Sequence, residues 1–383
     1  MKSRSFFEIG NMPVSIGVQY PSRRQAIGCV KGRLDLMFCP ACGFIWNSSF
    51  DAGLLEYSQR YENSLDHSSV FREYVRDLAR RLIHTYGIVN KRVLEIGCGK
   101  GHFLSLLCEE GANSGVGFDP SYVGERVRHS GRGSIEYHKD FYGDNHASKT
   151  GDLVCCRHVF EHIENPADFL AIVHRMINGN RNVIVYFEVP NVRFILNELS
   201  VWDVIYEHCN YFSRESLAYV FKRAGFDVIR LEESFGGQFL SIEARISIEE
   251  RDGREKSVYS VKTSELAESV DAFSLNVSAR SRPWIERLDL WRTDKTRAVI
   301  WGGGAKTVSF LNMLPVNETI TLVVDINPSK QGLYIPGSGQ EIVAPEILED
   351  YQPGAVILMN PIYKREVEQE LDEMKINASV IDA

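Results

Sequence analysis

Residues 93–111 read VLEIGCGKGHFLSLLCEEG, and this stretch decides the fold. An apolar run ends at Ile96, glycines follow at positions 97, 99 and 101, and a helical pattern begins around His102. The next apolar run ends with Asp119 in GVGFD. Glycine permits a sharp turn and the close approach of a ligand, and the helix behind it offers unpaired N–H groups. The stretch therefore predicts a strand, a ligand-binding loop, a helix and a second strand.

Strands and helices continue to alternate around this stretch. Apolar runs at 92–97, 114–119, 152–157 and 182–190 are typical of strands buried on both faces of a parallel sheet. Apolar spacing over Ser69–Tyr86 predicts an amphipathic helix before them. A second α/β pattern begins at RAVIWGGG, residues 297–304. The fold class is therefore α/β, with two Rossmann-like units.

At 383 residues the chain is longer than one hydrophobic core usually supports. We divide it into a small β-rich N-terminal domain (1–55), a central Rossmann-like domain (56–248), a connecting helical segment (249–285) and a C-terminal Rossmann-like domain (286–383).

Composition limits the function classes. No segment approaches eighteen consecutive apolar residues, and residues 1–17 lack the apolar core of a secretory signal, so we expect a cytoplasmic protein without a membrane span. A net charge of −8 opposes nucleic-acid binding. The eight cysteines are scattered, which suits reduced thiols better than disulfides. We expect a small-molecule partner, and the sequence says little about oligomeric state.

The acid inside the loop distinguishes between two ligands. A glycine-rich turn and a distal acid also describe a dinucleotide site. Glu95, however, would face a pyrophosphate unfavourably, whereas it suits the cationic amino-acid portion of S-adenosyl-L-methionine. The spacing of Glu95, Gly97, Gly99 and Gly101 resembles motif I of class I methyltransferases, in which Asp119 would accept hydrogen bonds from the ribose hydroxyls. We therefore predict a methyltransferase rather than a dehydrogenase.

Two further pairs complete the predicted cofactor site. Asp140 and Phe141 follow a third strand, where this class recognises adenine by a carboxylate and a stacked ring; core packing is the alternative for Phe141. Arg157 and His158 end the fourth strand, over the expected position of the reactive methyl group.

The sequence also resembles a narrower family, the C-methyltransferases that act on nucleotide-linked 4-keto-deoxysugars in deoxysugar biosynthesis. The likeness rests on CPACGFIWN (39–47), the glycine loop, FEVPN (187–191), IYEHCNYFSRESL (205–217), GGQFLSIEA (236–244), WGGGAKT (301–307) and VVDINPSKQGLYIPG (323–337). It implies removal of a proton beside a ketone and attack of the resulting enolate carbon on the sulfonium methyl group.

Such chemistry needs a base, a group that steadies the enolate oxygen, and exclusion of water. We expect His208 to be the base and Glu207 to assist it or bind the sugar. Family members commonly carry a second histidine just before this pair, where the present chain has Tyr206. Which catalytic role each of these residues has therefore stays open. A solvated loop histidine is the alternative.

The resemblance also assigns residues outside that segment. His162 is similar to a histidine near the reacting carbon, and Tyr61 to a tyrosine that closes over the substrate; ordinary packing is the alternative for both. Asn191 either contacts the sugar or caps a helix. Lys306 begins a helix in the C-terminal domain and would meet a phosphate of the nucleotide, unless that loop is only structural.

The sequence contains only half of the cysteine ligands expected for a zinc site. Cys39 and Cys42 form one ligand-like pair, and the family holds its N-terminal domain with two. The first family pair would fall before or at Met1, and Cys29 lacks a paired neighbour. Zinc therefore stays open, as do three alternative functions: O- or N-methylation of another small molecule, a non-catalytic binding module, and a zinc-dependent nucleic-acid methyltransferase.

Overall fold

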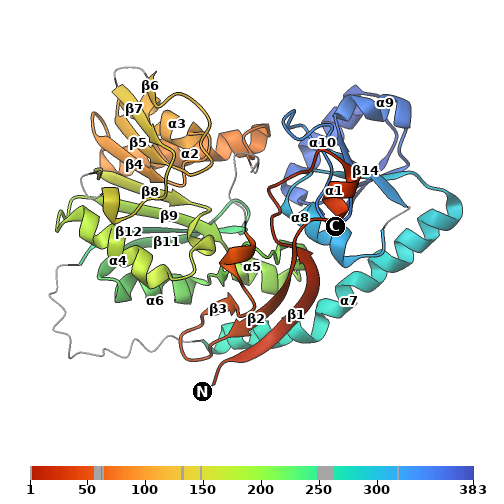
Figure 1. The fold of residues 1–383 in the computed structure, drawn as a ribbon, viewed down its shortest axis with the longest axis horizontal. Coiled ribbons are helices and arrows are strands. Elements are labelled where there is room, and N and C mark those ends of the chain that lie inside the picture. The colour runs from red at the N-terminus through yellow and green to blue at the C-terminus, as the bar shows by residue number, and fades with distance from the viewer. Residues whose placement is uncertain are drawn as a thin grey trace.

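The computed structural model describes residues 2–55, 62, 64–130, 133–146, 149–247, 263–316 and 319–383. These residues form three sheets, of four, eight and five strands (Figure 1). The predicted α/β class, with two Rossmann-like units and a small β-rich N-terminal unit, is confirmed. Among the described residues, no helix is both long enough and apolar enough to cross a membrane.

The central sheet is built around five parallel strands: β4 (Arg92–Ile96), β5 (Ser114–Phe118), β7 (Gly133–His138), β8 (Leu153–Arg157) and β9 (Ile184–Pro190). Their spatial order is β9-β8-β4-β5-β7, so the chain reverses direction across the sheet between β4 and β8. Ligands bind beyond the carboxyl ends of the strands at such a switch point. The antiparallel edge strands are β6 (Val127–Ser130), β11 (Phe226–Ser234) and β12 (Phe239–Ile246).

Helices cover both faces of this sheet because each has an apolar stripe. The predicted helix over Ser69–Tyr86 is α2, and its apolar residues pack with those of α3 (His102–Gly111) on one face. The other face is covered by α4 (Pro166–Ile177) and α6 (Arg214–Arg223). The glycine loop thus lies between β4 and α3, as the sequence predicts.

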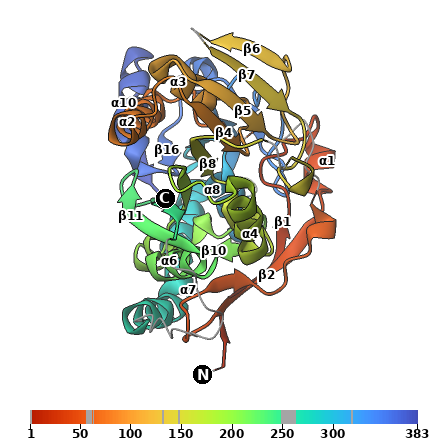
Figure 2. The same cartoon turned by 90° about the vertical axis from the view of Figure 1, so that its left-hand side faces the viewer.

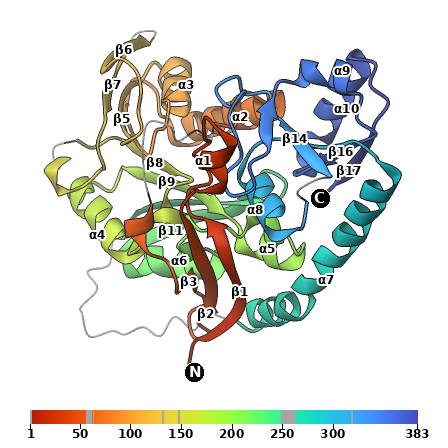
Figure 3. The same ribbon diagram turned by 45° about the vertical axis from the view of Figure 1, so that its right-hand side comes forward.

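The N-terminal sheet lies between the central and C-terminal domains (Figures 1 and 3). It consists of β1 (Arg4–Pro13), β2 (Lys31–Phe38), β3 (Ile45–Asn47) and, from the central domain, β10 (Asn210–Tyr211). Asn210 pairs with Trp46 and Tyr211 with Ile45 in antiparallel register. The segment that carries His208 is therefore fixed against the N-terminal domain.

A 31-residue helix, α7 (Ser264–Asp294), connects the N-terminal sheet with the C-terminal domain. It continues beyond the predicted end of the connecting segment at residue 285, because its buried positions include Trp284 and Leu288. The C-terminal sheet is parallel throughout, in the order β15-β14-β13-β16-β17. Its main elements are β13 (Ala298–Trp301), α8 (Ala305–Met313), β14 (Ile320–Val324), β15 (Glu341–Val343), β16 (Ala355–Leu358), α10 (Lys364–Glu373) and β17 (Ser379–Asp382).

Short helices complete the described elements. They are α1 (Arg23–Ile27), η1 (Ala52–Leu54), η2 (Asp144–His146), η3 (Phe160–His162), α5 (Val192–Asn197), η4 (Val201–Asp203), η5 (Pro345–Ile347), α9 (Leu348–Tyr351) and η6 (Pro361–Tyr363).

Candidate active site

The glycine loop has the backbone that a bound cofactor requires. Gly97, Gly99 and Gly101 have φ angles of 72°, 52° and 80°, in the left-handed region that favours glycine. A Cβ on Gly97 would lie 2.1 Å from Val159, and one on Gly101 would lie 2.4 Å from Tyr137. A Cβ on Gly99 would meet nothing within 4 Å. The outer glycines are thus needed by the protein's own packing, whereas Gly99 keeps the backbone open toward a ligand.

Glu95 is a buried carboxyl group beside this loop. The residue is only 3% exposed, and its Oε2 atom is buried without a hydrogen-bond partner. Burial raises the pKa of Glu95 to about 8, against the opposing effect of Arg157. A carboxylate in this state is stabilised by a cation that reaches its free oxygen. The ammonium group of S-adenosylmethionine is a positively charged hydrogen-bond donor, which is the partner that this oxygen lacks. The residues present therefore fit the cofactor.

The predicted ribose and adenine residues lie beyond the next two strands. Asp119 is held in place by the N–H of Gly99 at 2.8 Å and that of Ser121 at 2.8 Å. The Phe141 side chain is 63% exposed. Asp140 accepts from the Phe141 N–H and pairs with His146, which lowers the pKa of Asp140. Asp119, Asp140 and Phe141 thus sit at the carboxyl edge of the sheet, where a nucleoside would bind.

Arg157 and His158 converge on Glu188, a residue that the sequence motifs do not single out. The Arg157 guanidinium donates to Glu188 Oε1 at 3.1 Å and 2.9 Å, and His158 Nε2 lies 3.1 Å from the same oxygen. Glu188 is completely buried on β9, and Tyr74 and Tyr186 both donate to its second oxygen. Burial disfavours the ionised carboxylate, but Arg157 and His158 hold the pKa of Glu188 well below its usual range. The Arg157 guanidinium is therefore engaged in a buried ion pair with Glu188 and is not free to contact the methyl group.

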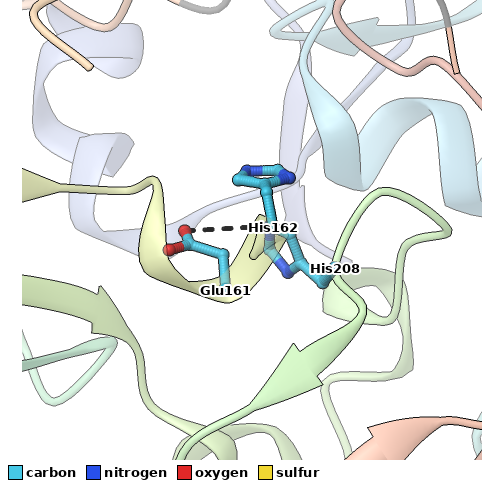
Figure 4. Close-up of side chains that lie close together, drawn as sticks. All are labelled: Glu161, His162 and His208. Atoms are coloured by element: carbon cyan, nitrogen blue, oxygen red, sulfur yellow. Dashed lines mark ion pairs between the residues drawn. The ribbon is translucent and has the colours of Figure 1, made fainter. Parts of the chain in front are cut away.

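Glu161, His162 and His208 form a second cluster (Figure 4). Glu161 and His162 come from η3, and His208 comes from the turn before β10. Glu161 Oε1 lies 4.0 Å from His208 Nε2, and His162 Nδ1 lies 2.9 Å from the carbonyl oxygen of Glu207. The two imidazole rings meet edge to face at 5.0 Å. The structure thus brings together two predicted residues, His162 and His208, with one that was missed.

The protonation of this cluster suits a general base. Burial lowers the pKa of His162 to about 4. Burial, together with His162 and His158, lowers the pKa of His208 well below its usual value. At neutral pH His208 is therefore uncharged, the form that can accept a proton. Burial also raises the pKa of Glu161 to about 8.

The ligand atoms of the cluster lie farther apart than those around a tetrahedral zinc ion. Ligand atoms at the usual zinc distance of about 2 Å in a tetrahedral site lie roughly 3.4 Å apart. Here Glu161 and His208 are 4.0 Å apart, and His162 Nδ1 already has a partner. Among the described residues this is the only group of three or more whose ligand atoms come close enough to be considered for a metal.

The predicted roles of Tyr206 and Glu207 need correction. The Tyr206 hydroxyl accepts from the Asp51 N–H at 2.9 Å, and its ring stacks on Phe50. Glu207 accepts from the Ile16 N–H at 2.7 Å instead of assisting His208. Both residues lie in the turn before β10, and both side chains contact the backbone of the N-terminal domain. They secure the segment that carries His208.

The remaining predicted residues are also explained by local contacts. Asn191 caps α5 by accepting from the Arg193 N–H at 3.0 Å, and it donates to the carbonyl of Gly237. Lys306 pairs with Asp203 at 2.9 Å, so its charge secures α8 to the central domain and is not directed at an open phosphate site. Tyr61 lies outside the described residues.

Cys39 and Cys42 lie close enough for their side chains to hydrogen bond. Cys29 contacts the backbone of Gly337 in the C-terminal domain instead. Within the described ranges, no third metal-ligating side chain joins the pair. A two-thiolate set does not fill a tetrahedral zinc site, and zinc binding stays a prediction.

Comparison with known families agrees with this architecture. Residues 70–231 match the family model of a methyltransferase domain. Residues 236–380 match that of a C-methyltransferase C-terminal domain. The chain therefore carries both domains, in that order. The prediction of an S-adenosylmethionine-dependent methyltransferase is confirmed at the level of its domains.

Curated relatives match only part of the chain. A ubiquinone biosynthesis O-methyltransferase of Aeromonas salmonicida is 27% identical over 104 residues, which cover 26% of this chain and 44% of that protein. One from Aromatoleum aromaticum is 26% identical over 162 residues, covering 38% and 68%. The chain thus spans less than half the length of the first of these relatives.

Solved structures show a similarly partial likeness. A didemethyltoxoflavin N1-methyltransferase of Burkholderia thailandensis has a TM-score of 0.34 and 14% identity, covering 47% of this chain and 81% of its own. For an S-adenosylmethionine-dependent methyltransferase of Listeria monocytogenes the TM-score is 0.34, with 14% identity and coverage of 46% and 99%.

Proposed function

We propose that this protein is an S-adenosylmethionine-dependent C-methyltransferase that acts on the carbon beside a ketone, with nucleotide-linked keto-deoxysugars as its substrate class. The observation that carries the proposal is the environment of the His208 side chain. Its side chain is 12% exposed, its pKa is lowered, and its Nδ1 atom is buried without a hydrogen-bond partner. An uncharged imidazole with an unused nitrogen is suited to removing a proton.

His208 is connected with the cofactor loop by a chain of contacts. Glu161 lies within 4.0 Å of both His208 and His158, and His158 and Arg157 share Glu188. Arg157 in turn acts electrostatically on Glu95 beside the loop. A base at one end and a cation-binding carboxylate at the other would serve a reaction between a carbon acid and a sulfonium ion.

Each residue has a defined task in this reaction. When bound, S-adenosylmethionine supplies a methyl group on a positively charged sulfur. His208 takes the proton as the substrate C–H bond breaks, and the electron pair moves toward the ketone oxygen. The low exposure of His208, 12%, limits the access of water to the base, and Glu95 orients the ammonium end of the cofactor.

Solvent exchange tests the proposal. Purified protein is incubated with S-adenosylmethionine and a panel of nucleotide-linked 4-keto-deoxysugars in deuterated water. We expect methyl transfer to carbon, and deuterium incorporation at the carbon beside the ketone. His208→Ala should lower both rates by about 100-fold or more. The control His84→Ala changes an exposed histidine of α2 and should leave both rates unchanged.

O-methylation is the second candidate, because the two curated relatives are named as O-methyltransferases. Transfer to an oxygen needs no acidic C–H bond. A methylated product without deuterium at carbon would therefore favour O-methylation, and absence of exchange and transfer on every keto-sugar would reject the proposed substrate class.

A further inference from the structure

Glu161 is a buried carboxylate that the proposed reaction does not yet use. It is 2% exposed and lies in η3, between β8 and α4. Its Oε1 atom is 3.9 Å from His158 Nδ1 and 4.0 Å from His208 Nε2. Its Oε2 atom is buried without a hydrogen-bond partner. One carboxylate thus lies between two imidazole rings, where it can act on both.

The geometry distinguishes the two nitrogens of His208. Nε2 faces Glu161, whereas Nδ1 is buried with no partner. A neutral imidazole carries one proton, and the partner of one nitrogen decides which nitrogen keeps it. Glu161 Oε1 lies 4.0 Å from Nε2, beyond hydrogen-bond distance, so the ionised carboxylate acts through its charge, which favours the proton on Nε2 and leaves the lone pair on Nδ1.

We propose that Glu161 is the positioning residue of the base: it holds the His208 proton on Nε2, so that Nδ1 takes the proton from the substrate. This role rests on the proposed function. When Nδ1 accepts the proton, the C–H electron pair stays on the substrate and His208 becomes an imidazolium. The negative charge of Glu161 then stabilises that imidazolium.

Two other buried carboxylates near His208 are already engaged by other groups. Glu188 is engaged by Arg157 and Tyr186, and Glu207 is bound to the Ile16 N–H. Glu161 therefore differs from both in having an oxygen to spare. The charged and titratable groups that face it are His158 from the end of β8, His162 from η3, His208 from the turn before β10, Glu188 from β9, Cys156 from β8 and Cys209 beside β10.

The position implies a pH signature. Burial raises the pKa of Glu161 to about 8, so its charged form grows as the pH rises through that value. Proton removal by the wild-type protein should therefore speed up between about pH 7 and pH 9. Glu161→Gln keeps the shape of the side chain but cannot ionise, so this rise should disappear.

The experiment measures the exchange rate against pH for the wild type, Glu161→Gln and the control Glu164→Gln, which changes an exposed carboxylate two residues after His162. We expect Glu161→Gln to lower kcat by about 100-fold above pH 8 and by less below it, with KM and S-adenosylhomocysteine affinity within about twofold. Glu164→Gln should match the wild type. An unchanged high-pH limb in Glu161→Gln would overturn the inference.

Nitrogen-15 NMR of labelled histidine gives a second measurement that needs no turnover. At about pH 9, where Glu161 is ionised, we expect the His208 proton on Nε2 in the wild type and a mixture of the two tautomers in Glu161→Gln. The same tautomer in both proteins would also overturn the inference. A wild type inactive on every keto-sugar but with the proton on Nε2 would reject the proposed function while the positioning role stands.

Discussion

Glu95 shows how one buried carboxylate links stability to cofactor binding. Its pKa in the folded protein is raised to about 8 from an ordinary value of 4.5. The stability associated with its neutral form is thus present below the ordinary value and is lost as the pH rises through 8. Glu95→Gln removes this loss. We expect its Tm to equal that of the wild type near about pH 5 and to exceed it by a few degrees near about pH 8.5.

The same variant should bind the cofactor less well. A charge-assisted hydrogen bond contributes about 1.5–3 kcal/mol, so S-adenosylmethionine affinity should fall by about 10- to 100-fold in calorimetry. Glu125→Gln, an exposed carboxylate past β5, is the matched control for both measurements. A Tm difference that does not depend on pH would contradict the assignment.

Local sequence predicted where Glu95 and the loop glycines lie, within and directly after one strand, and their role in cofactor binding stays a prediction. The His208 segment was harder to predict. The sequence identifies the motif, but the direction of each side chain depends on how β10 pairs with β3. The contacts of Tyr206 and Glu207 with the N-terminal domain were not predicted for that reason. Glu161 had a signal, an acid between His158 and His162, but only the fold shows that the same acid also reaches His208.

At the scale of elements, the C-terminal domain holds the first helix of the central domain in place (Figure 2). Glu366 of α10 accepts hydrogen bonds from the Ser68 hydroxyl at 2.7 Å and from the Ser69 N–H at 2.8 Å. A carboxylate at a helix N-terminus satisfies unpaired N–H groups and opposes the helix dipole. The same helix carries Tyr74, which donates to Glu188 in the site.

Removing this carboxylate should loosen α2 from its beginning. We expect Glu366→Ala to lower the free energy of unfolding by about 1–2 kcal/mol and to speed amide exchange in the first turn of α2. Glu368→Ala changes an exposed carboxylate of the same helix and should do neither. Denaturant titration and hydrogen-exchange mass spectrometry measure the two effects, and equal exchange in both variants would refute the capping role.

At the scale of the whole molecule, one of the four clusters of buried side chains among the described residues crosses the domain boundaries. A single cluster of buried side chains takes members from β1, β2, α5, η4, α7 and the C-terminal sheet. At its centre the Phe310 ring lies 4.8 Å from Trp202 and 5.1 Å from Trp284. Sequence patterns predict each unit separately, because an apolar stripe does not specify which other unit covers it. Separate domains would unfold separately, but a shared core couples them.

Unfolding should therefore be cooperative across these units. The five tryptophans, at positions 46, 202, 284, 291 and 301, report from the N-terminal sheet, η4, α7 and the C-terminal sheet. We expect fluorescence and far-UV circular dichroism to give the same denaturant midpoint. Phe310→Ala should lower both midpoints together and reduce the free energy of unfolding by about 3–5 kcal/mol, whereas Leu275→Ala, at an exposed position of α7, should change neither. If only part of the dichroism shifted in Phe310→Ala, the C-terminal domain would unfold alone, and its contacts with α2 and η4 would not couple its stability to the active site.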